Sequence, residues 1–294
     1  PAGGGCDYTS LQTAINAMTG GGTIMANGSV GSNVNIPAGR SFTITGGTIS
    51  VSLTTASTGN HIIGMTAQGF HDDGGNNIFE GNTATSTFAL HSVGGSFAFG
   101  NTLFSVQLGS NNNEFYNNYM GNDLRINNGS HGNWVHDNYR PLIGSRSTAF
   151  WIQSGAYNNT IENNDFSNTT SHSLSILSSD DNIIRNNNFS DSGENSLSTS
   201  RGIQDSNGND IIDNDFSNSK DNGFLITNSD YNLFESNNFD GNPDYGISNT
   251  AASVGNEFRY NSFSYGYDGF LDCNGCLNTS FHENLLLNNT HFSI

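Results

Sequence analysis

The stretch Asn159-Thr-Ile-Glu-Asn-Asn-Asp-Phe166 decides the fold, because the chain repeats it many times. Strong copies of the pattern Asn-x-[Ile/Phe/Val]-x-x-Asn-x-Phe start at Asn182, Asn209, Asn232 and Asn256, and weaker ones at Asn77, Asn113, Asn133 and Thr279. The second Asn recurs at steps of 20 to 27 residues from Asn118 onward, and the longer step before it indicates a degenerate copy around Asn101.

Each repeat consists of short alternating segments joined by polar turns, and a second half-repeat such as Gly223-Phe-Leu-Ile-Thr-Asn-Ser lies between copies. A unit of about 23 residues made only of short strands cannot bury its apolar side alone, whereas stacked units can. The sequence therefore predicts an all-β, single-stranded parallel β-helix. With coils about 4.8 Å apart, roughly eleven of them form a rod about 50 Å long.

Within each copy, the third and eighth positions, such as Ile184 and Phe189, are expected to point inward. The second Asn is expected to form a ladder, because stacked amides can donate to the next coil and accept from the previous one. The predicted structural ladder comprises Asn118, Asn138, Asn164, Asn187, Asn214, Asn237, Asn261 and Asn284. The same register places Glu162 beside Arg185 and Glu235 beside Arg259 on the outer surface.

The first residues differ from the repeats. Ser10–Met18 is the one expected helix, with Ser10 or Thr9 as its N-cap and three glycines after it. Such a helix would cover the open apolar end of the first coil. We therefore expect a single domain over residues 1–294, with an N-terminal cap at 1–22 and coils at 23–294.

The charge balance excludes several partners. The chain has 26 Asp and Glu against 8 Lys and Arg, a net charge of -18, and Lys220 is its only lysine. Nucleic acids and anionic membrane surfaces are bound by clustered basic residues, so we expect neither as a partner. No apolar run is long enough to predict a membrane insertion.

The opening segment Tyr8-Thr-Ser-Leu-Gln-Thr-Ala-Ile-Asn16, followed by Gly21-Gly-Thr-Ile24, resembles the start of domains in the pectin-lyase-like superfamily. The later copies resemble NosD-type parallel β-helix repeats, which occur in many secreted and surface proteins, including those of methanogenic archaea. The resemblance implies a right-handed coil. It implies no single function, because the superfamily includes lyases, hydrolases, epimerases, tailspikes and non-catalytic surface proteins.

Catalytic candidates are few. Polygalacturonases carry an Asp-Asp pair followed by Gly-His-Gly and Arg-Ile-Lys; Asp180-Asp181 matches the pair, but neither later motif follows. If the protein is an enzyme, the candidate residues are Asp180, Asp181, Asp205 and Arg201, since paired carboxylates and an arginine can serve acid-base chemistry. The alternative for each is a turn or surface role, as for the other pair, Asp72-Asp73.

Metal sites are equally sparse. His131 and His136 lie near Asp137, but zinc needs three or four converging ligands, so no metal site is predicted. Calcium is the one cofactor considered, with Asp165, Asp213 and Asp215 as weak candidate ligands at the corners of the coils.

The three cysteines allow disulfides, with free thiols as the alternative. Cys273 and Cys276 are candidates for a local disulfide, and Cys6 for an intermolecular one. Seven sequons allow glycosylation, although their number is no more than chance predicts. They are Asn27, Asn128, Asn158, Asn168, Asn188, Asn278 and Asn288. The low lysine content, the abundance of Asn, Ser, Gly and Thr, and the class of repeat predict a secreted or cell-surface protein.

Two functional hypotheses remain. The first is a non-catalytic structural protein that assembles with itself into a surface layer, sheath or filament, motivated by Cys6 and by apolar Leu285-Leu-Leu287 and Phe292-Ser-Ile294 near the last coil. The alternative is a polysaccharide-acting enzyme or a polysaccharide-binding spike. Its motivation is the fold and a set of aromatic residues able to stack on sugars: Tyr116, Tyr119, Trp134, Tyr139, Trp151 and Tyr157.

Overall fold

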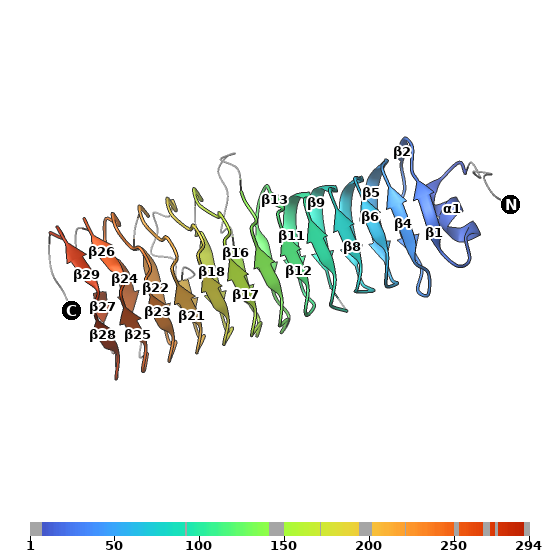
Figure 1. Cartoon of the computed structure of the whole chain (residues 1–294). Coiled ribbons are helices and arrows are strands. Elements are labelled where there is room, and N and C mark those ends of the chain that lie inside the picture. Colours follow the sequence, from blue (N-terminus) through green and yellow to red (C-terminus); the bar gives the residue numbers. More distant parts are fainter. Residues whose placement is uncertain are drawn as a thin grey trace.

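The computed structural model describes residues 8–91, 93–140, 150–170, 172–193, 202–220, 222–249, 253–266, 271–273 and 276–290. The chain winds into a rod of about 12 turns with the first and the last described coils at opposite ends (Figure 1). The predicted right-handed parallel β-helix is confirmed. The turn count slightly exceeds the predicted eleven because early coils are short; Asn60 and Asn77, one coil apart, are separated by only 17 positions.

One long sheet, which we call sheet A, contains 13 parallel strands, each paired with the equivalent strand of the next coil. Its middle residues, such as Ile161 and Ile184, point into the core and the flanking ones point outward. The strands are β1 (Gly22–Met25), β4 (Phe42–Thr45), β6 (His61–Ile63), β8 (Ile78–Glu80), β10 (Phe97–Phe99), β12 (Glu114–Tyr116), β15 (Trp134–His136), β17 (Thr160–Glu162), β19 (Ile183–Arg185), β21 (Asp210–Ile212), β23 (Leu233–Glu235), β25 (Glu257–Arg259) and β28 (Ser280–His282).

A second parallel sheet, sheet B, has 14 strands and packs on the opposite side of the core. Its strands are β2 (Ser29–Val30), β3 (Val34–Ile36), β5 (Thr48–Thr55), β7 (Thr66–Asp72), β9 (Thr83–Leu90), β11 (Thr102–Leu108), β13 (Tyr119–Met120), β14 (Leu124–Ile126), β16 (Phe150–Gln153), β18 (Leu174–Leu177), β20 (Gly202–Gln204), β22 (Phe224–Thr227), β24 (Ile247–Asn249) and β27 (Leu271–Cys273). A separate pair joins β26 (Ser262–Ser264) to β29 (Leu285–Leu287).

The expected N-terminal helix is present as α1 (Leu11–Ala17). Ser10 is its N-cap, since the hydroxyl accepts a hydrogen bond from the backbone N–H of Thr13. The helix buries Leu11 and Ile15 against the first coils and so covers the end of the rod, as Figure 1 shows. None of the described helical segments is long and apolar enough to cross a membrane.

The core is a continuous apolar column along the rod, built largely from stacked aromatic rings. Phe189, Phe216 and Phe239 are almost fully buried, and neighbouring rings lie 5.3 Å apart in near-parallel planes. Ring stacking in register follows from pairing identical positions of successive coils. The short sequence repeat therefore produces one uninterrupted core.

Two asparagine ladders run beside this core. In the expected one, the amide of Asn187 donates to the Oδ1 atom of Asn214 on the next coil at 3.0 Å and accepts from Asn164 of the previous coil. This ladder extends through Asn82, Asn101, Asn118, Asn138, Asn164, Asn187, Asn214, Asn237, Asn261 and Asn284. The second was not predicted, although it uses the first Asn of the repeat. It contains Asn60, Asn77, Asn113, Asn133, Asn159, Asn182, Asn209, Asn232 and Asn256, with Ser96 in place of one Asn.

Backbone geometry explains the other polar residues at the corners. The residue before each later Asn of the expected ladder has positive φ, as in Asn163 at 55° and Asp213 at 53°. Asn and Asp tolerate this left-handed conformation better than most residues. Many of the Asn and Asp residues are thus accounted for by the fold.

Candidate functional site

The predicted catalytic carboxylates lie together at one corner of the rod, on two adjacent coils. Asp180 Oδ1 accepts a hydrogen bond from the backbone N–H of Asn207 at 2.7 Å, and Asp205 Oδ1 accepts one from the side chain of Asn228 at 2.6 Å. Asp181 and Asp205 both have positive φ. All three side chains are exposed and at least two of them support the corner, while Arg201 lies outside the described residues.

The calcium candidates do not converge. Asp165, Asn188 and Asp215 occupy equivalent positions of successive coils, joined by isolated parallel β-bridges, so Asn188 separates the two carboxylates. Each of the two aspartates accepts a hydrogen bond from the residue two positions later in the chain. Asp213 lies at the left-handed corner position before Asn214. Over the described part of the chain, no three or more His, Cys, Asp or Glu side chains are placed to hold a metal ion.

The structure describes all of the predicted glycosylation sites but only some of the predicted disulfide cysteines. Cys276 is disulfide-bonded; Cys6 and the side chain of Cys273 lie outside the described residues, so the pairing with Cys273 stays a prediction. Six of the seven sequon asparagines are exposed and Asn188 is half-buried.

The six aromatic candidates do not form one row. Tyr116 and Trp134 lie on the outer surface of sheet A, whereas Trp151 lies on sheet B. Tyr119 and Tyr139 are paired by an isolated parallel β-bridge, and their rings contact each other edge to face with centres 5.2 Å apart. Tyr157 stacks on His131 at a corner. Sugar contacts along the whole rod would therefore have to use different faces.

On the outer face of sheet B, Arg125 and Trp151 are paired neighbours on β14 and β16. The guanidinium carbon of Arg125 lies 5.9 Å from the centre of the indole, a cation-π contact. Its Nε atom donates to Asp123 Oδ2 at 2.6 Å. We call Asp123, Arg125 and Trp151 the sheet B cluster.

Asp123 is the residue that holds the sheet B cluster in place. Its side chain is only 6% exposed, and its other oxygen accepts hydrogen bonds from Ser105 and Asn122. Arg125 remains 43% exposed. Its two Nη atoms and Trp151 Nε1 form no hydrogen bond to any of the residues described. The cluster thus presents fixed, outward-facing donors.

The same face carries a small hollow further toward the N-terminus. It has a volume of about 150 Å³ and is lined by Ser52, Gln68, Gly69, His71, Ser86 and Thr87. Burial, followed by the neighbouring His91, lowers the pKa of His71, and Asp73 opposes this shift. The imidazole is therefore neutral at pH 7 and can both donate and accept hydrogen bonds.

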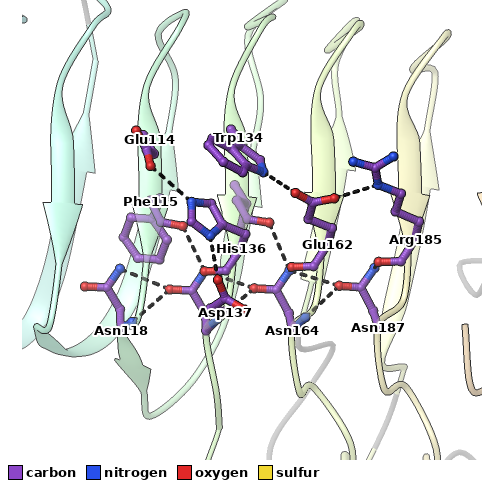
Figure 2. A network of polar contacts seen from close by, with 12 residues as sticks. Glu114, Phe115, Asn118, Trp134, His136, Asp137, Glu162, Asn164, Arg185 and Asn187 are labelled. Carbon is purple, nitrogen blue, oxygen red and sulfur yellow. Dashed lines mark hydrogen bonds and ion pairs between the residues drawn. The ribbon is translucent and has the colours of Figure 1, made fainter.

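Sheet A carries a second polar and aromatic cluster, which Figure 2 shows spanning several coils. The Nε1 atom of Trp134 donates to Glu162 Oε1 at 2.7 Å, and Arg185 Nε donates to Glu162 Oε2 at 2.6 Å. The indole also stacks on His136, with ring centres 3.9 Å apart. We call Trp134, Glu162 and Arg185 the sheet A cluster; the sequence register predicted only its Glu162–Arg185 pair.

Further along sheet A, the second predicted ion pair is present, with Arg259 Nη2 2.7 Å from Glu235 Oε2. Asp210 lies on the same outer surface. Burial raises the pKa of the Asp210 carboxyl, and repulsion from Glu235 and Asp181 adds to this, while Arg259 opposes it.

Comparison with known proteins agrees with this architecture. Residues 126–270 match the family model described as periplasmic copper-binding protein (NosD). This part of the chain is thus similar to NosD-type repeats, which belong to the right-handed parallel β-helix class. No curated protein sequence matches it.

Solved structures similar to this chain include several polysaccharide-acting enzymes. An alginate lyase of family PL6, in complex with a trisaccharide, superposes with a TM-score of 0.66 at 15% identity, covering 96% of this chain and 82% of that one. A double mutant of the periplasmic alginate epimerase AlgG gives 0.59 at 11%, covering 86% and 77%. The catalytic unit of a GH87 α-1,3-glucanase from Streptomyces thermodiastaticus gives 0.51 at 12%, covering 93% and 66%. Identities this low show a shared fold.

Proposed function

We propose that this protein binds an acidic polysaccharide on the outer face of sheet B, outside the cytoplasm. The observation that carries the proposal is the fixed guanidinium of Arg125, which lies beside Trp151 and whose Nη atoms form no hydrogen bond to any residue that the structure describes. A guanidinium recognises a carboxylate or a sulfate through two parallel hydrogen bonds, and an indole edge can donate a further one.

Preorganisation supports binding at this position. Asp123 and the indole hold Arg125 before any ligand arrives, so less side-chain entropy is lost on binding. The net charge of -18 would repel polyanions over long distances. The outward-facing Nη atoms of Arg125, which form no hydrogen bond to any described residue, are therefore the part of this face where an acidic sugar is best accommodated.

The neighbouring polar surface suits a sugar chain. The hollow beside His71 offers hydroxyl, amide and imidazole groups to sugar hydroxyls. The similar structures include an alginate epimerase and an alginate lyase, and alginate is an acidic polysaccharide, which supports this ligand class. We propose binding alone, because Asp180 and Asp205, two of the sequence-predicted acids, hydrogen-bond across a corner of the rod.

The structural hypothesis concerns the C-terminal coil of the rod. In the last described coil, Leu277, Leu285 and Leu287 are 58%, 52% and 48% exposed. A self-assembling protein would use this apolar end for contacts between copies. Light scattering that reports polymers abolished by Leu285→Ser would favour that hypothesis.

Affinity electrophoresis tests the proposed binding. The protein is run through native gels containing alginate, polygalacturonate, dextran sulfate or unmodified dextran. We expect at least one acidic polymer to retard the wild type, dextran not to, and Arg125→Gln or Trp151→Ala to weaken binding about tenfold. Lys220→Gln is the control for loss of one positive charge, and Tyr231→Ala for loss of an exposed aromatic ring. Equal retardation of Arg125→Gln and Lys220→Gln would refute the proposal, as would no retardation by any acidic polymer.

A further inference from the structure

The two tryptophans of the chain lie in similar surroundings on different sheets. Trp134 donates to Glu162 and Trp151 lies over the guanidinium of Arg125, and each cluster contains a nearly buried carboxylate that accepts a hydrogen bond from the Nε atom of its arginine. In the sheet A cluster the carboxylate is Glu162, whose side chain is 12% exposed, and the arginine is Arg185, at 47%. Figure 2 shows Glu162 between Trp134 and Arg185.

Two contacts, one of them itself supported by a third ring, hold the indole of Trp134 rigidly at the surface. Its Nε1 atom donates to Glu162, its ring stacks on His136, and His136 in turn stacks on Tyr116 at 5.0 Å. The ring nitrogens of His136 lie 3.2 Å from Glu114 Oε1 and 2.8 Å from Asp137 Oδ2. This support fixes the plane of the indole.

Trp134 nevertheless remains 42% exposed. Because its only polar atom is hydrogen-bonded within the protein, the exposed part of the side chain is apolar and flat. Such a surface suits the C–H face of a sugar ring. A structural tryptophan would instead be expected to bury its ring.

Arg185 supplies the complementary polar group. Only its Nε atom donates to Glu162, and its Nη atoms form no hydrogen bond to any of the described residues. It lies on β19, two coils from Trp134 on β15, which corresponds to about 10 Å along the rod. A sugar chain stacked on the indole can therefore place the carboxylate or sulfate of a following residue at the guanidinium.

We propose that the sheet A cluster is a second saccharide-binding site and that the protein links two acidic polysaccharide chains. Sheets A and B share one core, so their outer faces point away from each other. One chain would bind to the sheet B cluster and another to the sheet A cluster. The class of ligand rests on the proposed function, whereas the second site rests on Trp134, Glu162 and Arg185.

The first test separates the two sites. In the double variant Arg125→Gln/Trp151→Ala, we expect binding to the retarding acidic polymer to persist and to fall about tenfold further on adding Trp134→Ala. Complete loss of binding in the double variant would overturn the second site and leave the proposed function intact. Residual binding that neither Trp134→Ala nor Arg185→Gln weakens would also overturn the second site. Alginate and dextran sulfate run in parallel distinguish a carboxylate from a sulfate.

The second test measures linking directly. Biotinylated alginate on streptavidin beads is mixed with fluorescent alginate and the protein, and captured fluorescence is recorded; dextran sulfate replaces alginate in both roles if it is the polymer retarded in gels. Wild type and Tyr231→Ala are expected to capture the labelled chain, and Trp134→Ala to lose capture while still binding the beads. Capture that survives Trp134→Ala would overturn the proposal.

Glu162 is a positioning residue, and a spectroscopic readout tests that role. Glu162→Gln retains an acceptor for the indole but removes the charge beside Arg185, so we expect the Trp134 Nε1–H resonance to remain downfield while polymer affinity falls. Glu162→Ala is expected to shift that resonance and to weaken binding further. An unchanged affinity in Glu162→Ala would overturn the role assigned to Glu162.

Discussion

Removing one amide from the asparagine ladder should destabilise the rod far more than a surface substitution. Asn187 is 2% exposed and makes five side-chain hydrogen bonds. Its Oδ1 accepts from the backbone N–H and the Nδ2 of Asn164, and its Nδ2 donates to two carbonyl groups and to Asn214. Asn187→Ala removes all of these contacts at once.

The magnitude follows from the groups left behind. Asn164 Nδ2 keeps its bonds to the carbonyl groups of Val135 and Glu162, but the Asn164 N–H loses its side-chain acceptor. One buried unsatisfied donor costs about 1–3 kcal/mol, and the other lost bonds contribute about 0.5–1.5 kcal/mol each. Because the neighbouring carbonyls share other donors, we expect a total loss of about 3–5 kcal/mol in the free energy of unfolding.

Urea unfolding followed by circular dichroism measures this loss. The control is Asn186→Gly, the adjacent exposed residue at φ 55°, where glycine is tolerated and a change within about 1 kcal/mol is expected. If Asn187→Ala and Asn186→Gly unfold at the same urea concentration, the ladder does not stabilise the fold as described.

Three further predictions concern titration and packing. Because the folded pKa of Asp210 is raised above its unfolded value of 3.8, its charge destabilises the native state at neutral pH; Asp210→Asn should be more stable than wild type at pH 7, with the difference vanishing as the pH falls toward 4. A constant difference across that range would contradict this. The lowered pKa of His71 means that the unfolded chain protonates first below pH 6.5, so wild type should lose stability there and His71→Gln should lose less, as thermal melts at pH 7.5 and 5 can show. Phe216→Ala should cost about 3–5 kcal/mol, because the ring is 2% exposed between two stacked neighbours; a cost below 1 kcal/mol in urea unfolding would show that the stack closes over the cavity.

The fold could be predicted from the sequence because residues at the same position of successive coils have the same structural role and therefore recur at regular spacing. The spacing of Asn164, Asn187 and Asn214 fixes the register, and that register places Glu162 beside Arg185. The unpredicted ladder through Asn159 and its equivalents was visible in the same repeat. It was missed because only the second Asn of each copy was assigned a role.

The binding clusters were harder to predict for a physical reason. Arg125 and Trp151 are neighbours on sheet B but are 26 positions apart, at a point where the repeat is weak. The hydrogen bond from Trp134 to Glu162 is diagonal, joining the first residue of one strand to the last residue of the next. Periodicity identifies residues that are paired in register, but it does not reveal which outward side chains contact a residue outside their own pair.

The most direct test of saccharide binding uses the two tryptophans as separate reporters. Two indole Nε1–H resonances are expected in a ¹⁵N-labelled sample, and Trp151→Phe assigns them. On titration with short alginate or polygalacturonate oligosaccharides, we predict that the Trp151 resonance shifts saturably in the wild type but not in Arg125→Gln. A Trp151 resonance that stays unchanged while the oligosaccharide binds elsewhere would contradict the account.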